Sequence, residues 1–228
     1  MKVKNPIVVA SLVGLTIIIG VAAYTFLKPE PEPAVHSATY GYYHQESRVG
    51  ELQLTLTGTR TYQFEGDFGV NTTVGEIGGS FNGDAEYTRD WTPAWSSFSQ
   101  SYKDSSLPLP TAVDAGILVD LTIDTTFLLL PERWAGIHAG YSTQFAPSIP
   151  SSGATELDLE MTAVGTQGVV VPSGSFGNCF VVNGTRPDME LEMTIWVASR
   201  DIVPQAEITM PVRGVGPLIL TLKLEHYQ

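Results

Sequence analysis

The residues best suited to bind a cation are two sets of alternating carboxylates: Glu156, Asp158 and Glu160, then Asp188, Glu190 and Glu192. Alternate residues share one face of a β-strand, and Ca²⁺ takes about six to eight oxygen ligands. Neither set follows the EF-hand loop pattern, and like charges on directly paired strands repel. We therefore expect a solvated outer sheet face, on strands that are not adjacent, and we assign no metal site or cofactor. We expect Asp114, Asp120 and Asp124 on loops and strand faces.

Candidate catalytic groups are few and scattered. Ser173-Gly174-Ser175 lacks the Gly-x-Ser-x-Gly pattern of a nucleophile elbow. Cys179, the single cysteine, lies in an apolar run that predicts a small buried side chain. The histidines at positions 36, 44, 138 and 226 have no carboxylate at a spacing that would orient them. The sequence therefore predicts no catalytic residue.

Aromatic residues are dense in one polar part of the chain. Trp91, Trp95 and Phe98 follow one another closely there, and Trp134 lies farther along. Tryptophan is enriched at ligand pockets and partner surfaces. We predict these four as ligand-binding residues, with packing in the core as the alternative.

Two N-x-[S/T] sequons mark candidate glycosylation sites. They begin at Asn71 and Asn183, both in sequence that favours turns. A glycan there requires that the domain lies outside the cell.

The element that decides this location is a hydrophobic segment near the start of the chain. Pro6 to Leu27 contains no charge, and a helix of that length spans roughly 33 Å, enough for a bilayer core of about 30 Å. Lys2 and Lys4 precede it, which favours a cytoplasmic N-terminus and a C-terminal domain outside. Residues 1–28 are therefore predicted as a cytoplasmic stub and signal-anchor helix of a single-pass protein of the cell membrane. A cleaved signal peptide ending near Ala22-Ala23 is the alternative.

The residues after the predicted anchor form a linker and carry all of the acidic side chains. Alternating proline and glutamate at the start of residues 29–37 predicts an extended spacer. Three of the 12 basic residues lie in residues 1–28 and all 24 acidic residues follow, so the remainder carries a formal charge of −15. Without basic clusters, a large nucleic-acid interface is excluded. A single cysteine excludes an intramolecular disulfide.

Residues 38–228 are predicted as one extracytoplasmic β-rich domain. Apolar residues alternate with polar ones at 51–57, 156–161, 188–195 and 218–227, as in antiparallel strands with one buried face. Turns are predicted at Gly58, Gly66-Asp67, Gly78-Gly79, Asn82-Gly83, Asn183-Gly184 and Gly214–Pro217. Leu107–Pro110 is predicted as a loop, and Pro131–Ala139 is the one stretch with helical character. The fold class is mainly β: an antiparallel sheet of about ten strands, as a curved half-barrel or a sandwich, with one short helix.

A family resemblance begins at the hairpin that Val169–Val182 predicts. Apolar strands at 194–197 and 202–207 and a last strand ending at Tyr227 follow it. Over residues 165–228 this succession resembles the superfamily of the lipoprotein-localisation factors. The resemblance implies a curved sheet over a short helical layer, to which Pro131–Ala139 would contribute, and an apolar ligand such as a lipid. The membrane anchor and the low helical content are departures from that family.

These observations favour a membrane-anchored extracytoplasmic binding protein, with the bilayer as a partner of residues 6–27. Its ligand would be a lipid, another apolar molecule or an envelope protein. The first alternative is a structural or accessory subunit of a surface filament or membrane complex, which would expose a strand edge. The second alternative is an extracytoplasmic hydrolase.

Overall fold

The computed structural model describes residues 37–88, 93–103, 106–145, 159–198 and 202–228. The predicted anchor and almost all of the predicted linker lie outside these residues. Within the part that is described, no helix is both long enough and apolar enough to cross a bilayer.

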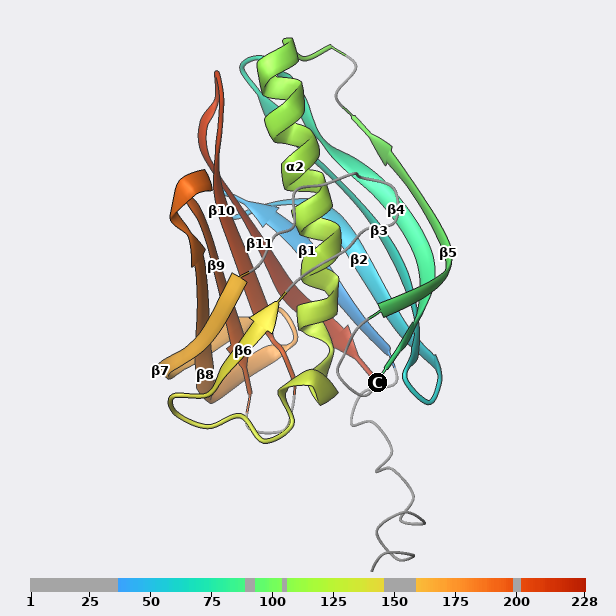
Figure 1. Ribbon diagram of the computed structural model, residues 1–228, viewed down its shortest axis with the longest axis vertical. Helices are drawn as coiled ribbons and strands as arrows, with labels where there is room; N and C mark the ends of the chain where they lie inside the picture. The colour runs from blue at the N-terminus through green and yellow to red at the C-terminus, as the bar shows by residue number, and fades with distance from the viewer. Residues whose placement is uncertain (1–36, 89–92, 104–105, 146–158, 199–201) are drawn as a thin grey trace, which may run out of the picture. The chain divides into compact units, whose positions relative to one another are not determined.

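The described residues form one open antiparallel sheet of eleven strands in the order β5-β4-β3-β2-β1-β11-β10-β9-β8-β7-β6 (Figure 1). The first five strands are β1 (Ser37–His44), β2 (Ser47–Gly58), β3 (Thr61–Thr72), β4 (Gly75–Tyr87) and β5 (Pro93–Tyr102). The remaining six are β6 (Ser142–Phe145), β7 (Leu159–Val171), β8 (Gly174–Arg186), β9 (Leu191–Val197), β10 (Gln205–Val212) and β11 (Gly216–Tyr227). A mainly β fold is thereby confirmed, and it is a single sheet.

The sheet consists of two meanders joined at its centre. β1 to β5 run outward on one side, and β11 back to β6 run outward on the other. The first and last strands pair with each other, with Ala38 opposite Tyr227. Ser37 and Gln228 extend this pairing by exchanging backbone hydrogen bonds of 3.2 and 3.0 Å. One end of the sheet therefore carries both the start of β1 and the end of β11.

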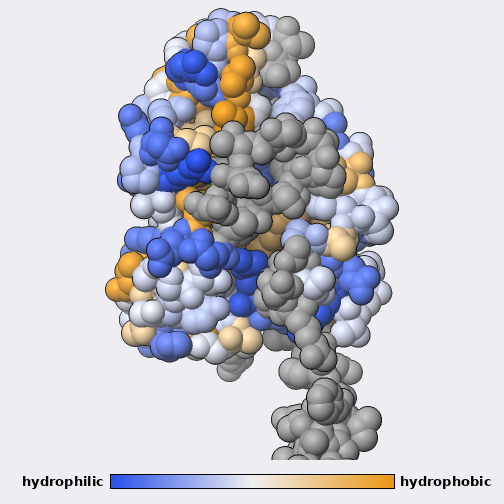
Figure 2. Space-filling view, viewed as in Figure 1, coloured by the Kyte–Doolittle hydropathy of each residue, from blue (hydrophilic) through white to orange (hydrophobic). Residues whose placement is uncertain are grey.

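A helix, α2 (Leu109–Thr125), connects the two halves and crosses the face around which the sheet curves (Figure 1). Two short 3-10 turns follow, η1 (Thr126–Leu129) and η2 (Pro131–Trp134). Every residue from Leu118 to Leu130 is buried. The start of α2 is different, because Leu109 is 80% and Val113 is 50% exposed, and hydrophobic residues appear at the top of the molecular surface there (Figure 2).

The predicted position of the helix is wrong. Helix α2 begins at Leu109, inside the segment predicted as a loop, and Pro131–Ala139 contributes only the four residues of η2. Threonine and other β-branched residues of α2 have low helix propensity. From Leu118 onward the helix is buried on all sides, so that part shows no polar face in the sequence. Asp114, Asp120 and Asp124 consequently lie on α2, not on loops or strand faces.

Several predicted turns are also wrong. Gly66-Asp67 lies inside β3, Gly78-Gly79 and Asn82-Gly83 lie inside β4, and Asn183-Gly184 lies inside β8. Close packing explains two of these glycines: a side chain at Gly66 would meet the ring of Phe81, and one at Gly78 would meet the backbone of Phe68. The turn at Gly214–Pro217 and the β7–β8 hairpin, where Val171 pairs with Gly174, are confirmed.

The core between α2 and the first meander depends on one aromatic ring. Phe127 is 2% exposed, and its ring centroid lies 5.3 Å from that of Trp95, 5.5 Å from Phe64 and 5.7 Å from Tyr87. Edge-to-face contacts of this kind add to the stabilisation from burial. The ring therefore links η1 to β3, β4 and β5.

We predict that Phe127→Ala lowers the free energy of unfolding by about 3–5 kcal/mol, because it removes a buried ring and leaves a cavity. Urea unfolding of the full chain measures this effect. The matched control is Val113→Ala on the exposed face of α2, which should change the free energy by about 0.5 kcal/mol or less. Similar effects for the two variants would contradict this account of the core.

Candidate apolar ligand site

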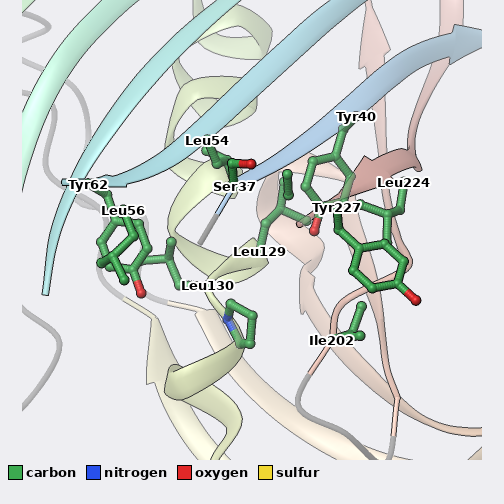
Figure 3. Close-up of a pocket in the computed structure, with 12 residues that line it drawn as sticks. Ser37, Tyr40, Leu54, Leu56, Tyr62, Leu129, Leu130, Ile202, Leu224 and Tyr227 are labelled. Carbon is green, nitrogen blue, oxygen red and sulfur yellow. The ribbon is translucent and has the colours of Figure 1, made fainter. Parts of the chain in front are cut away.

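An apolar cavity of about 20 Å³ lies at the end of the sheet where β1 begins and β11 ends (Figure 3). Its walls come from β1, β2, β3, the η1–η2 segment, β11 and the residue Ile202. The lining residues are Ser37, Ala38, Tyr40, Leu54, Leu56, Tyr62, Leu129, Leu130, Pro131, Ile202, Leu224 and Tyr227. This volume holds about one water-sized sphere. The sequence did not predict this site, because its walls come from six separate parts of the chain.

The polar atoms of two cavity tyrosines are engaged elsewhere. Tyr40 donates its hydroxyl to the carbonyl oxygen of Val203 at 2.9 Å. Tyr62 donates its hydroxyl to Oε2 of Glu132 at 2.7 Å. Burial raises the pKa of both tyrosines, and at Tyr62 the hydrogen bond to Glu132 adds to this effect. Both hydroxyls stay neutral at physiological pH, so the rings present apolar surface to the cavity.

The predicted aromatic ligand residues do not line this cavity. Trp91 lies outside the described residues. Trp95 and Phe98 lie together on β5, with ring centroids 4.7 Å apart. Trp134 is fully buried and donates its Nε1–H to the carbonyl of Leu128 at 2.7 Å. Trp95, Phe98 and Trp134 therefore make contacts typical of core packing, which is the alternative given above. Ligand binding by these residues stays a prediction.

A polar cluster joins α2 to β5 and is partly exposed, since Tyr102 is 37% exposed. Tyr102 donates its hydroxyl to Oδ1 of Asp120 at 2.8 Å. Asp124, one turn farther along α2, is 3% exposed, and its Oδ1 has no hydrogen-bond partner. Burial raises the pKa of Asp124 well above its ordinary value, and the nearby charge of Asp120 raises it further. The helix that covers the sheet thus carries a carboxyl group that costs free energy to bury.

The acidic strands do not converge on a metal site. Glu160 on β7 and Glu192 on β9 are exposed, and β8 lies between their strands, which confirms that these strands are not adjacent. Glu156 and Asp158 lie outside the described residues, and Asp188 lies in η3 (Pro187–Met189), not in a strand. Within the described ranges, no group of three or more His, Cys, Asp or Glu residues could hold a metal ion.

A second hollow, of about 360 Å³, lies over strands β2 to β5. Its lining includes the carboxylates of Glu51, Glu65 and Asp67 and the side chains of Gln53 and Asn82. Such a lining favours water over an apolar chain. We therefore place the candidate apolar site at the smaller cavity.

The remaining candidate groups lie apart from one another. His44 bonds the carbonyl of Ile219, His138 that of Gly136, and His226 the amide of Gln228. His36 lies outside the described residues. Cys179 is buried, as predicted.

Both sequon asparagines are exposed. Asn71 lies near the end of β3, whereas Asn183 lies in the middle of β8 and not in a turn. Glycosylation of either residue stays a prediction.

Comparisons of this chain with protein-family models, with curated proteins and with solved structures found no match. The resemblance to the lipoprotein-localisation factors over residues 165–228 therefore stays a prediction.

We predict that Asp124→Asn makes the free energy of unfolding less dependent on pH. The raised pKa of Asp124 means that the folded state holds this proton more tightly than the unfolded state does. Stability from this group is present below the ordinary carboxyl pKa and is lost as pH rises through the folded pKa. The amide that replaces the carboxyl cannot ionise, so the variant should gain stability relative to wild type as pH rises, as urea unfolding at a series of pH values would show.

The matched control is Asp114→Asn on the same helix. Asp114 accepts hydrogen bonds of 2.7 to 2.9 Å from Arg213, which lower its pKa. Its stabilisation is present above the ordinary carboxyl pKa and is lost as pH falls. This variant should therefore lose stability relative to wild type at neutral pH. A response of the same sign in both variants would contradict the assignment.

Proposed function

We propose that this chain is a single-pass, membrane-anchored binding protein for an apolar ligand, a lipid or its acyl chain, on the extracytoplasmic side. The observation that carries the proposal is the apolar cavity at the end of the sheet where β1 begins. The rings of Tyr40 and Tyr62 and the side chains of Leu54 and Leu129 line it. Burial of each methylene of a ligand there would contribute about 0.8 kcal/mol.

Binding of an acyl chain requires the cavity to enlarge. At about 20 Å³ it has room for about one water-sized sphere. The η1–η2 segment forms one wall, and the hydrogen bond from Tyr62 to Glu132 ties that wall to β3. The other oxygen of Glu132, Oε1, is buried without a partner. In the proposal, an entering chain displaces η1 and η2 from β2 and β3 and occupies the space between them.

The chain connectivity supports a source of ligand in the adjacent bilayer. Ser37 lines the cavity and is the first described residue. Residues 29–36 of the predicted linker attach directly to it, and eight extended residues reach about 26–29 Å. The cavity is therefore within a short tether of the predicted anchor at residues 6–27.

We predict that a phosphatidylcholine with a photoactivatable acyl chain labels the cavity of the full chain in liposomes. Mass spectrometry should find the label on peptides that contain Leu54, Leu56 and Leu129. Leu56 lines the cavity, so Leu56→Trp places a larger side chain there and should lower cavity labelling roughly tenfold, the effect of about 1.4 kcal/mol. Ile219→Trp, at an exposed position on β11 away from the cavity, is the control and should leave labelling unchanged. Label confined to residues 6–27 would refute lipid binding by this domain.

A second candidate function, a structural or accessory subunit, is favoured by the edge of the sheet at β5. Among the described residues this strand pairs only with β4. Its ten residues, Pro93–Tyr102, carry no charge. Edge strands are usually protected from pairing by charged side chains or by prolines, and here only Pro93 at the start provides such protection. The edge is suited to accept a strand from a neighbouring subunit.

We predict under this second function that the detergent-solubilised chain associates through β5. Ser99→Lys places a charge on the exposed side of this edge strand and should weaken self-association by roughly tenfold or more. Gln63→Lys, at an exposed position on the interior strand β3, is the matched control and should behave as wild type. Sedimentation velocity at a series of concentrations measures the association. A wild-type chain that remains monomeric both alone and in extracts of its native membrane would exclude this function.

A further inference from the structure

A long uncharged stretch forms most of one hairpin of the sheet. The 25 residues from Met161 to Thr185 contain no Asp, Glu, Lys or Arg, in a chain whose net charge is −12. They cover nearly all of β7 and β8. Val170 is 75% exposed, and it lies next to the turn that joins the two strands. We define the hairpin tip as residues 169–176.

The hairpin tip lies at the same end of the sheet as the apolar cavity. Ser173, in the turn, donates its backbone N–H to the carbonyl oxygen of Leu224 at 3.1 Å. Leu224 lines the cavity and pairs with Tyr40 of β1. Ser37, where the predicted linker attaches, lines the same cavity. One end of the domain therefore combines the tether, the cavity and the hairpin tip.

We infer that the hairpin tip contacts the interfacial region of the bilayer in which the predicted anchor lies, and so holds the cavity next to the lipid. This inference rests on the anchor and on the lipid binding proposed above. Exposed valine at a charge-free tip fits the boundary between headgroups and acyl chains. A zwitterionic surface suits an acidic domain, because anionic lipids would repel it.

Because the predicted linker tethers the domain to the bilayer, a small contact between the hairpin tip and the membrane is sufficient. A linked module meets its target at an effective concentration of about millimolar, so a weak contact is occupied much of the time. The hairpin tip need not bind membranes when it is separated from the anchor. This distinguishes it from an independent membrane-binding domain, which requires a larger apolar surface or a basic one.

The test uses the full chain in phosphatidylcholine liposomes, with the buried native thiol removed by Cys179→Ala. A fluorophore is attached at Val170→Cys, or at Ser47→Cys as the control. Ser47 is exposed and begins β2, at the opposite end of the sheet. With acyl-chain-brominated phosphatidylcholine, quenching at position 170 should be at least about twofold stronger than at position 47. A fluorophore at Ser175→Cys should lose its quenching when Val170→Asp is added.

Equal quenching at positions 170 and 47 would overturn the inference. A second copy bound at the hairpin tip would instead give self-quenching that is removed by dilution into excess lipid, and that result also overturns it. Photolabelling of the cavity in the same liposomes separates the two proposals. Lipid quenching at position 170 without cavity labelling supports the hairpin contact and refutes the binding function. Cavity labelling with equal quenching at both positions refutes the hairpin contact alone.

Discussion

The pairing of β1 with β11 is the contact on which the rest of this structure depends. It joins the strand nearest the start of the described chain to the strand at its end, so it closes a sequence separation of nearly the whole domain. Within each meander, strands consecutive in the sequence pair with each other, and among the described residues only this central pair unites the two meanders into one sheet. It also sets Tyr40 against Leu224 and Ser37 beside Gln228, which builds two walls of the cavity. A non-local pair of this kind forms at a large cost in loop-closure entropy.

The second constraint is that one helix must cover the curved face of so wide a sheet. From Leu118 onward α2 is buried on all sides, which explains its apolar composition and the aromatic packing around Phe127. The buried carboxyl of Asp124 opposes this packing, since its Oδ1 finds no partner. The same covering segment ends in η1 and η2, which form a wall of the apolar cavity.

The functional proposals share one end of the domain. The cavity, Ser37 at which the predicted linker attaches, and the uncharged β7–β8 turn all lie there. The acidic side chains of Glu160 and Glu192 lie on the exposed face of their strands instead. The hairpin tip has no charged residue, and it is the surface for which we propose the membrane contact.

The sequence by itself determined the β-rich class, the β7–β8 hairpin and the last strand, because alternation and turn residues act over a few neighbouring positions. It also determined the uncharged segment at Pro6–Leu27 and the acidic composition of all that follows. Only the tertiary structure decided where the helix lies, since burial of α2 on all sides from Leu118 onward removes the periodicity that marks a helix there. It likewise decided that Gly66 and Gly78 lie inside strands, where a ring or a neighbouring backbone occupies the space that a side chain would need. The cavity depended most on the tertiary structure. Its lining residues, from Ser37 near the start of the domain to Tyr227 near its end, meet there through the pairing of β1 with β11, which no local sequence pattern encodes.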